Sequence, residues 1–360
     1  MLNPYIPLIG LSDKEYNIYA KHLILENIGL NGQKRLKKAK ILVIGAGGLG
    51  CPALMYLVVS GIGYIGIIDN DYIDLSNLNR QILYSLDDIN HMKTTSAKNK
   101  IKNINKQCKI ITHNYKLCQK NASEIIQYYD IIIDANDNFK TRYIIDKICY
   151  KLHKIHIYGA IQEFEGQITV FNYQNSNRYS KIYPERLNLI DNNCNNYGVI
   201  GIITGNIGII QATEAIKIIL GIGQIINNKI LRCNLLNISF YQTQIYNLKK
   251  SNKYKNKLLY NNYLKKIISL SKFHSLNKSN KQFLLIIDLR QKNEFKEKHI
   301  SKSINIPINK LKINKSLQFL QKNNKYKTIV IYCNKIYRSV IASYILHSHN
   351  IDHYILNNIK

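Results

Sequence analysis

Short apolar runs alternate with longer segments of helical periodicity over the first two thirds of the chain. Runs rich in β-branched residues predict buried strands, and apolar residues repeated every three or four positions predict helices. The expected strands are Lys40–Ile44, Tyr64–Ile68, Lys109–Asn114, Asp130–Asp134 and Ile155–Tyr158, and the expected helices are residues 12–38, 52–60, 93–105, 122–129, 139–153 and 204–220. Ser12 followed by Glu15 is typical of a helix start. The alternation predicts an α/β fold with a doubly wound, mostly parallel sheet. Gly166–Asn172 alternates apolar and polar side chains and predicts an antiparallel extension of that sheet.

The pattern changes after Lys249, where a charged stretch carries no apolar period and predicts a linker. A second, smaller α/β unit follows, with expected strands at Leu284–Leu289 and Thr328–Tyr332 and an expected helix at Ser339–Leu346. The expected organisation is therefore a first domain over residues 1–248, a linker and entry segment over 249–281, and a second domain over 282–360.

The formal net charge is +29, which raises the hypothesis of a nucleic-acid binder. The lysines are spread along the whole chain, and the chain is also rich in Asn, Ile and Tyr, so a nucleotide bias of the genome accounts for the surplus. A basic docking surface for an acidic partner is the alternative, and no nucleic-acid partner is expected. No run of 18 uncharged apolar residues occurs, and no membrane partner is expected.

Seven cysteines form no CxxC pair. An odd number without paired spacing argues against a disulfide framework and against a structural zinc site of two such pairs. We expect a reducing compartment and no zinc.

The strongest single motif is Gly45-x-Gly47-x-x-Gly50, which follows a predicted strand and begins a predicted helix. Glycines let the backbone approach a phosphate, and the helix N-terminus offers free N–H groups. Asp69 closes the second strand, where a carboxylate meets a ribose hydroxyl. This combination predicts a Rossmann-like nucleotide-binding domain, with a glycine turn that binds nothing as the alternative.

Polar residues beyond Asp69 suggest that a triphosphate is cleaved. The segment Ser76-Asn77-Leu78-Asn79-Arg80 carries an arginine that can pair with phosphate oxygens, and Lys93 at the next helix start can neutralise another phosphate. Asp137 follows the strand DIIID and can hold Mg²⁺ bridged to phosphates. The alternatives are a helix N-cap for Asp137 and a surface ion pair for Arg80.

These motifs, with EGQITVF further on, resemble those of the MoeB/ThiF family of ubiquitin-activating-like adenylyltransferases over roughly residues 12–248. The resemblance implies a homodimer that binds ATP and adenylates the C-terminal Gly-Gly tail of a small sulfur carrier, MoaD-like or ThiS-like, with release of pyrophosphate. It assigns nucleotide binding to Gly48, Asp69, Ser76–Arg80, Lys93 and Asp137, with Asp137 as the magnesium ligand. Arg80, Lys93 and Asp137 are also the expected catalytic residues of the adenylation step.

Two departures from the family pattern affect the site. The family's N-terminal arginine, which reaches the partner subunit's ATP, is replaced by Lys21, which keeps the charge but loses the two-pronged geometry. The family's CxxC zinc ligands are absent, which resembles the zinc-free branch that is fused to a rhodanese domain.

Cys194 matches the family cysteine that attacks the acyl-adenylate or binds the carrier transiently, with an inert loop cysteine as the alternative. Cys333 follows the strand TIVIY, and Cys333-x-x-x-x-Arg338-Ser resembles the rhodanese active-site loop. Asp288-x-Arg290, Glu294, His299 and Asn305-Ile-Pro307 extend that resemblance over about residues 282–356. Ile336 stands where the loop usually has glycine, so either Cys333 accepts sulfur with help from Arg338, or the domain keeps only the fold.

The expected function is carrier adenylation for molybdenum-cofactor biosynthesis, with ThiS activation or a ubiquitin-like modifier thioester at Cys194 as alternatives. A cysteine desulfurase is the expected sulfur donor. An NAD-dependent oxidoreductase has no use for Asn77, Arg80 and Asp137, which argues against that class. The A/T-type composition and the lack of a transit peptide lead us to expect an organelle-encoded plastid enzyme, or otherwise a bacterial cytoplasmic one.

Overall fold

The β-branched runs form the strands of an eight-stranded sheet in the first of two compact units. The computed structural model describes residues 9–185, 198–245, 267–279, 283–334 and 336–356. The strand order is β3-β2-β1-β4-β5-β6-β7-β8. The bounds are β1 Lys40–Ile44, β2 Tyr64–Ile68, β3 Lys109–His113, β4 Ile131–Asp134, β5 Ile155–Gln162, β6 Glu165–Phe171, β7 Lys229–Asn234 and β8 Ser239–Gln244.

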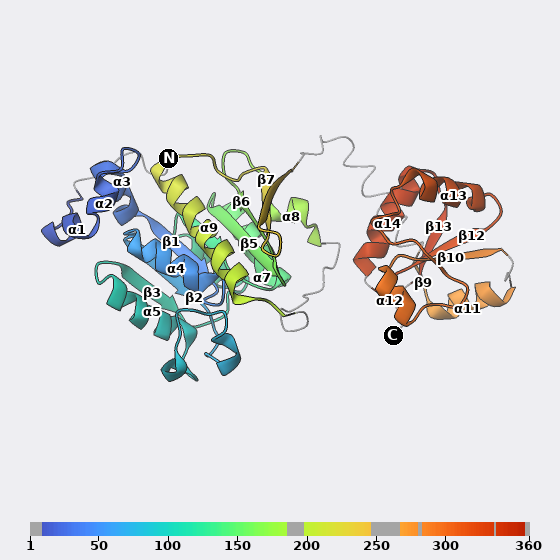
Figure 1. Cartoon of the computed structure of the whole chain (residues 1–360), viewed down its shortest axis with the longest axis horizontal. Coiled ribbons are helices and arrows are strands. Elements are labelled where there is room, and N and C mark those ends of the chain that lie inside the picture. The colour runs from blue at the N-terminus through green and yellow to red at the C-terminus, as the bar shows by residue number, and fades with distance from the viewer. Residues whose placement is uncertain (1–8, 186–197, 246–266, 280–282, 335, 357–360) are drawn as a thin grey trace. The chain divides into compact units, whose positions relative to one another are not determined.

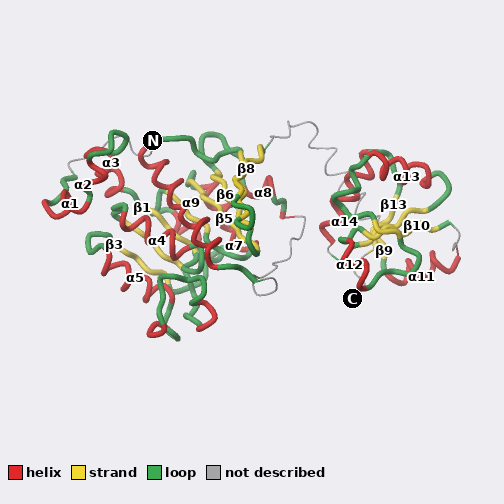
Figure 2. The backbone as a smooth tube through the Cα atoms, in the orientation of Figure 1, coloured by secondary structure: helices red, strands yellow, loops and turns green. Residues whose placement is uncertain are grey.

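Strands β1 to β5 pair in parallel, and β6 to β8 continue the sheet antiparallel. The predicted doubly wound sheet and its antiparallel extension at residues 165–171 are confirmed. The sequence analysis missed β7 and β8. Figure 2 shows the strands in yellow between the red helices.

Helices cover both faces of the parallel strands. Ile41 and Val43 of β1 pack with α3, α4, α5 and α9 on one face, whereas Leu42 and Ile44 pack with α6 and α7 on the other. The alternate side chains of one strand thus belong to two cores, as a doubly wound sheet requires. The helices are α4 Gly50–Val59, α5 Lys93–Ile104, α6 Ala122–Ile126, α7 Phe139–Lys151, α8 Tyr179–Ile182 and α9 Gly201–Leu220.

The N-terminal segment is broken where one helix over residues 12–38 was expected, so that prediction was wrong. It forms α1 (Asp13–Ile18), α2 (Ala20–Leu23) and α3 (Gly29–Lys38). Gly29 has a φ of +54°, in the left-handed region that does not continue a helix. The predicted start is confirmed, because Ser12 and Glu15 form a reciprocal capping box.

Helix α9 runs along the first unit in front of the sheet (Figure 1) and packs against α4 and strands β5 and β6. By length and composition alone it is apolar enough to cross a membrane, but 56% of its most apolar window is buried inside the unit. Buried Gln211 and Glu214 lie on the same helix. We therefore describe α9 as the central helix of the first unit.

The second unit holds a five-stranded parallel sheet of order β11-β10-β12-β13-β9. Strand β9 and helix α11 lie within residues 249–281, and β9 pairs with β13. The strands are β9 Ile267–Ile268, β10 Leu284–Asp288, β11 Ile304–Asn305, β12 Thr328–Tyr332 and β13 His353–Leu356, and the helices are α11 Leu270–Ser279, α12 Lys292–Glu297, α13 Asn314–Asn324 and α14 Ile336–Ser348.

Gly208 lets α9 approach α4 closely, because a Cβ at this position would overlap the carbonyl oxygen of Leu49 and lie 2.6 Å from Cγ of Pro52. Gly205, one turn earlier, has no described atom within 4 Å of such a Cβ. We expect Gly208→Ala to lower the free energy of unfolding of the first unit by about 1–3 kcal/mol through overpacking. Gly205→Ala, the matched control, should leave it unchanged or raise it by up to about 1 kcal/mol.

Urea unfolding followed by circular dichroism measures both variants. Equal unfolding midpoints for Gly208→Ala and Gly205→Ala would contradict the close packing of α9 on α4.

Candidate functional site

The carboxyl ends of β1, β2 and β4 lie side by side at one edge of the first sheet. Ile44, the last residue of β1, is in register with Ile68 of β2 and with Asp134 of β4. The chain continues from β1 to β2 on one side and reaches β4 on the other side only later, so the strand order reverses at β1. Doubly wound sheets bind their ligands in the crevice at such a switch point.

The glycine loop between β1 and α4 is fixed by close backbone contacts. Gly45 has a φ of +100°, and a Cβ there would lie 2.7 Å from the carbonyl oxygen of Ala135 in the loop after β4. A Cβ on Gly50 would overlap the carbonyl of Gly45. A side chain at Gly45 would push the two loops apart, and one at Gly50 would distort the glycine loop itself, which explains why the sequence has glycine at both positions.

Asp69, directly after β2, ties the glycine loop to the neighbouring strand. Its carboxylate accepts hydrogen bonds from the N–H groups of Ala46 (2.8 Å) and Asp71 (2.8 Å). Burial raises the pKa of Asp69, although Lys93 and the two N–H groups offset part of that rise. The carboxylate is thus held at the position where the sequence predicts a ribose contact.

Lys93 lies at the start of α5 with only 8% of its side chain exposed, and its ammonium group pairs with Asp71 at 2.9 Å. Asp71 is 61% exposed, so the partner of this lysine lies on the solvent side. Tyr84 donates its hydroxyl to the carbonyl of Ala46 (2.7 Å) and lies 3.2 Å from the carbonyl oxygen of Lys93. Neither Asp71 nor Tyr84 was among the expected site residues, because a local motif does not show which residues elsewhere in the chain will pair with Lys93 or Ala46.

The segment 76–80 folds onto itself and against the start of α9. Arg80 donates from Nη1 to the carbonyl of Ser76 (2.8 Å) and to Asn79 Oδ1 (2.9 Å). Thr204 of α9 donates to the carbonyl of Arg80 (3.3 Å), and Gly201 leaves no room for a Cβ beside the carbonyl of Asn79. The described structure thus gives the Arg80 guanidinium partners within its own segment instead of an ion pair.

Asp137 lies in the loop after β4, and its carboxylate is exposed. The alternative that Asp137 caps α7 is wrong, because Asn138 is the N-cap and accepts from the N–H of Thr141 (2.9 Å). Within the described residues, Asp137 forms no hydrogen bond or ion pair. One free carboxylate fits a cation that is shared with the phosphate oxygens of a nucleotide.

A buried polar network fixes the loop that carries Asp137. Asp134, fully buried, lies 3.1 Å from Nε2 of buried His156 and accepts from the N–H of Asn136 (3.2 Å). Asn136 also donates to the carbonyl of Ile44 (3.1 Å), which joins the loop to the end of β1. Arg142 donates to the carbonyl of Asn136 (2.6 Å). The sequence analysis missed this network, because His156 and Arg142 lie in other elements.

Most of the predicted nucleotide-binding residues thus lie at one edge of the sheet. They are Gly48, Asp69, Ser76, Asn77, Leu78, Asn79, Arg80, Lys93 and Asp137. Lys21 lies away from these residues in its own chain, because it is exposed on α2. Next to α2, Tyr19 and Gln33 contact Gly61 and Ser60, which follow the opposite end of α4. Cys194 lies outside the described residues.

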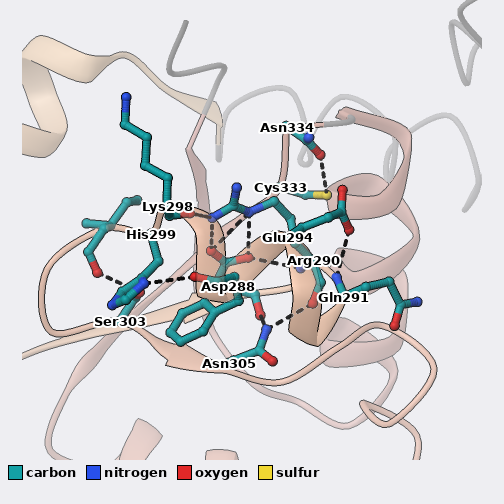
Figure 3. Close-up of polar contacts among 12 residues, drawn as sticks. Asp288, Arg290, Gln291, Glu294, Lys298, His299, Ser303, Asn305, Cys333 and Asn334 are labelled. Atoms are coloured by element: carbon teal, nitrogen blue, oxygen red, sulfur yellow. Dashed lines mark hydrogen bonds and ion pairs between the residues drawn. The ribbon is translucent and has the colours of Figure 1, made fainter. Parts of the chain in front are cut away.

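The second unit brings the residues of its motif together at the carboxyl ends of β10 and β12 (Figure 3). Cys333 is buried directly after β12, and its Sγ lies 3.5 Å from Oδ1 of Asn334. Buried Asp288 accepts three hydrogen bonds from the side chain of Arg290, two from Nε at 3.1 Å and one from Nη2 at 2.7 Å. Arg290 also reaches the carbonyl of Lys298, which joins the loops after β10 and α12.

Glu294 links α12 to the first turn of α14. It accepts from the N–H of Gln291 (2.8 Å) and pairs with Arg338 at 3.2 Å. Burial alone would raise the pKa of Glu294, but the Gln291 N–H and Arg338 lower it overall. Helix α14 begins at Ile336, three residues earlier than expected, so this β-branched residue is helical and does not need the left-handed backbone of a glycine.

Comparison with known proteins identifies both units. Residues 19–257 match the model of the ThiF family, and residues 269–358 match that of the rhodanese-like domain. The chain is 46% identical to the "Probable molybdopterin-synthase adenylyltransferase" of Gracilaria tenuistipitata var. liui, over 97% of this chain and 98% of the relative. It is 35% identical to the "Adenylyltransferase and sulfurtransferase MOCS3" of Culex quinquefasciatus, over 83% of this chain and 73% of the relative.

Solved structures match the first unit in fold. PaaA is similar with a TM-score of 0.57 at 23% identity, over 69% of this chain and 78% of that chain. The crystal structure of E. coli MccB with ATP is similar with a TM-score of 0.56 at 19% identity, over 68% of this chain and 82% of that chain. At this level of identity the likeness supports the Rossmann-like α/β fold alone.

The His156–Asp134 pair generates a prediction about the first unit. His156→Leu leaves the Asp134 carboxylate buried without its partner and should lower the free energy of unfolding by about 3–5 kcal/mol. His156→Gln keeps a donor and should cost clearly less. In the His156→Leu background, Asp134→Asn should restore part of the loss, because it removes the buried charge.

Urea unfolding of the three variants gives these energies. If His156→Leu unfolded at the same denaturant concentration as the unaltered chain, Asp134 would not depend on His156.

Proposed function

The chain belongs to the ThiF family and carries a rhodanese-like domain, and from this premise we propose that it uses ATP to adenylate the C-terminal glycine of a small sulfur-carrier protein in molybdenum-cofactor biosynthesis. Pyrophosphate is released in this reaction. Relatives named as adenylyltransferases match both units and nearly the whole chain, which supports the enzyme class. The geometry that carries the proposal is the exposed carboxylate of Asp137 held beside the glycine loop at the switch point.

The reaction joins a carrier carboxylate oxygen to the α-phosphorus of ATP while the bond to pyrophosphate breaks. A carboxylate is a poor nucleophile, so the site must act by holding the two reactants in line and by neutralising charge on the phosphates. No acid or base from the protein is needed for the attack itself, because the carboxylate is already ionised at neutral pH.

The residues at the sheet edge take the corresponding roles. Gly48 and the N–H groups of the glycine loop approach the phosphates, and Asp69 accepts a hydrogen bond from a ribose hydroxyl. Lys93 and Arg80 turn from their present partners toward phosphate oxygens. Asp137 holds Mg²⁺, which when bound neutralises phosphate charge. The remaining residues of the segment 76–79 orient the triphosphate.

Lys21 acts on a different subunit in this proposal. Its place at the far end of α4 keeps it from the site of its own chain, and α4 alone spans about 15 Å. We propose a homodimer in which Lys21 of each subunit reaches the ATP of its partner.

Sulfur transfer follows in the second unit. Cys333 takes a sulfane sulfur as a persulfide, and Arg338 stabilises the anion from the first turn of α14. A cysteine desulfurase is the proposed donor, whose persulfide gives its terminal sulfur to the Cys333 thiolate and is left as a thiolate. The Cys333 persulfide anion then attacks the carrier acyl-adenylate and forms an acyl disulfide, while AMP leaves. Cys194 is the proposed cysteine that meets the acyl-adenylate. We propose a plastid location, which the A/T-type composition and the red-algal source of three relatives support.

Pyrophosphate exchange tests the adenylation. With a purified carrier that ends in Gly-Gly, the chain should incorporate labelled pyrophosphate into ATP, and Asp137→Ala should reduce the rate about 100-fold or more. Asp130→Ala is the matched control: this aspartate lies at the other end of β4, where its carboxylate accepts from the N–H of Lys40, and the rate should be unchanged.

Exchange that does not depend on any Gly-Gly carrier, or that survives in Asp137→Ala, would refute the proposed reaction.

Thiosulfate:cyanide sulfurtransferase activity tests the second unit. Thiosulfate transfers its sulfane sulfur to the Cys333 thiolate with loss of sulfite, and cyanide removes that sulfur as thiocyanate. Cys333→Ser should abolish thiocyanate formation and leave carrier-dependent pyrophosphate exchange intact. Cys108→Ser, another buried cysteine, should change neither activity. Thiocyanate formation by Cys333→Ser at the original rate would assign the sulfur to another residue.

A further inference from the structure

Asn334, the residue directly after Cys333, contacts the sulfur that the proposed sulfur transfer uses. Its amide Oδ1 lies 3.5 Å from Sγ of buried Cys333 (Figure 3). A thiol donates a weak hydrogen bond to such an oxygen, whereas a thiolate has no proton to donate and is repelled by it. The contact therefore favours the protonated sulfur, which is not the nucleophilic form.

Glu294 determines which end of the Asn334 amide faces the sulfur. Burial alone would raise the pKa of Glu294, but contacts with Gln291, Arg338 and the side chain of Asn334 lower it overall, so this carboxylate is ionised at neutral pH. An ionised carboxylate only accepts hydrogen bonds, so the Nδ2 end of the Asn334 amide must face it. Both ends of the amide are thus assigned, with Nδ2 on Glu294 and Oδ1 on Cys333.

The charged side chains near Cys333 form pairs of opposite sign within the described part of the chain. These pairs are Glu294 with Arg338 at 3.2 Å and Asp288 with Arg290 at 2.7 Å. Burial raises the pKa of Tyr332, which is therefore neutral, and Lys335 lies outside the described residues. Because opposite charges are paired, a neutral amide in contact with the sulfur can shift the balance between thiol and thiolate.

We propose that Asn334 is a positioning residue that holds Cys333 in its thiol form between turnovers, with its amide oriented by Glu294. This inference deepens the proposed sulfur transfer at Cys333 and rests on it. The thiol proton must pass to solvent before Sγ attacks a sulfane sulfur, and the contact with Oδ1 opposes that loss. Cys333 is thereby less nucleophilic at neutral pH than the same cysteine without the amide.

Alkylation by iodoacetamide over a series of pH values tests the role of Asn334, because the thiolate is the reacting form. Mass spectrometry of the Cys333 peptide follows this sulfur separately from the other cysteines. Asn334→Ala removes the acceptor, so the pH midpoint of alkylation should fall by about 0.5–1 unit. The pH profile of kcat/KM for thiosulfate in the sulfurtransferase assay should shift in the same direction.

Glu294→Gln tests the orientation of the amide. Glutamine keeps the reciprocal cap at the start of α12, but its own amide both donates and accepts, so it no longer fixes which end of Asn334 faces it. The midpoint of Cys333 should fall in this variant too. In the Asn334→Ala background the same substitution should shift the midpoint by less than it does alone, because part of its effect passes through the amide.

Two controls accompany these variants. Glu297→Gln removes an exposed carboxylate from the same helix and should leave the midpoint of Cys333 unchanged. Cys118, partly exposed in the first unit, is an internal reference, and its alkylation should follow the same curve in every variant.

An unchanged or higher midpoint in Asn334→Ala would overturn the proposal. So would full additivity of the shifts in Asn334→Ala and Glu294→Gln, because Glu294 would then act on the sulfur by its charge and not through the amide. A failure of the proposed sulfur transfer is distinguishable from both results. It would appear as absent thiocyanate formation in the unaltered chain, whereas alkylation needs no sulfur donor.

Discussion

A Cβ atom on Gly45 would lie 2.7 Å from the carbonyl oxygen of Ala135, so only glycine lets the loops that follow β1 and β4 lie this close together. Asn136 strengthens the contact by donating to the carbonyl of Ile44. The glycine loop after β1 and the loop that carries Asp137 after β4 are thereby held next to each other at the switch point of the sheet. A site that works by positioning a triphosphate requires this rigidity, because misplacement of the reacting groups by about 1 Å reduces the rate strongly.

Most of the polar groups behind these loops are buried and hydrogen-bonded, although Nδ1 of His156 and Nε of Arg142 have no partner among the described residues. Asp134 joins His156 on β5 to Asn136 in the loop, and Arg142 of α7 holds the carbonyl of Asn136. In a low-dielectric interior, such a network is costly if one member is missing and rigid if all are present. The loop that carries the exposed Asp137 is thus held by buried hydrogen bonds that leave it little freedom.

The second unit also holds its loop residues in place at the carboxyl edge of a parallel sheet, which here is smaller. Its cysteine also follows a parallel strand at the carboxyl edge, and an Asp288–Arg290 pair fixes the adjoining loop. Glu294 accepts from the N–H of Gln291 at the start of α12 and pairs with Arg338 of α14, so it joins these two helices. Both units therefore place their reactive groups where strand ends and helix starts meet, which is where a parallel sheet leaves backbone N–H groups free for anions.

Local residue patterns were enough to predict the sheet class, the glycine loop, Asp69 after β2 and Cys333 after β12, because each depends on residues close together in the chain. Strands Lys40–Ile44, Tyr64–Ile68 and Thr328–Tyr332 have the predicted bounds, since continuous β-branched runs have few alternatives. Contacts between distant parts of the chain establish that Asn138 and not Asp137 caps α7, that Asp71 is the partner of Lys93, and that Oε1 of Gln81 is buried without a partner among the described residues. These facts depend on which distant side chains and backbone groups surround a position, and local periodicity carries no information about that.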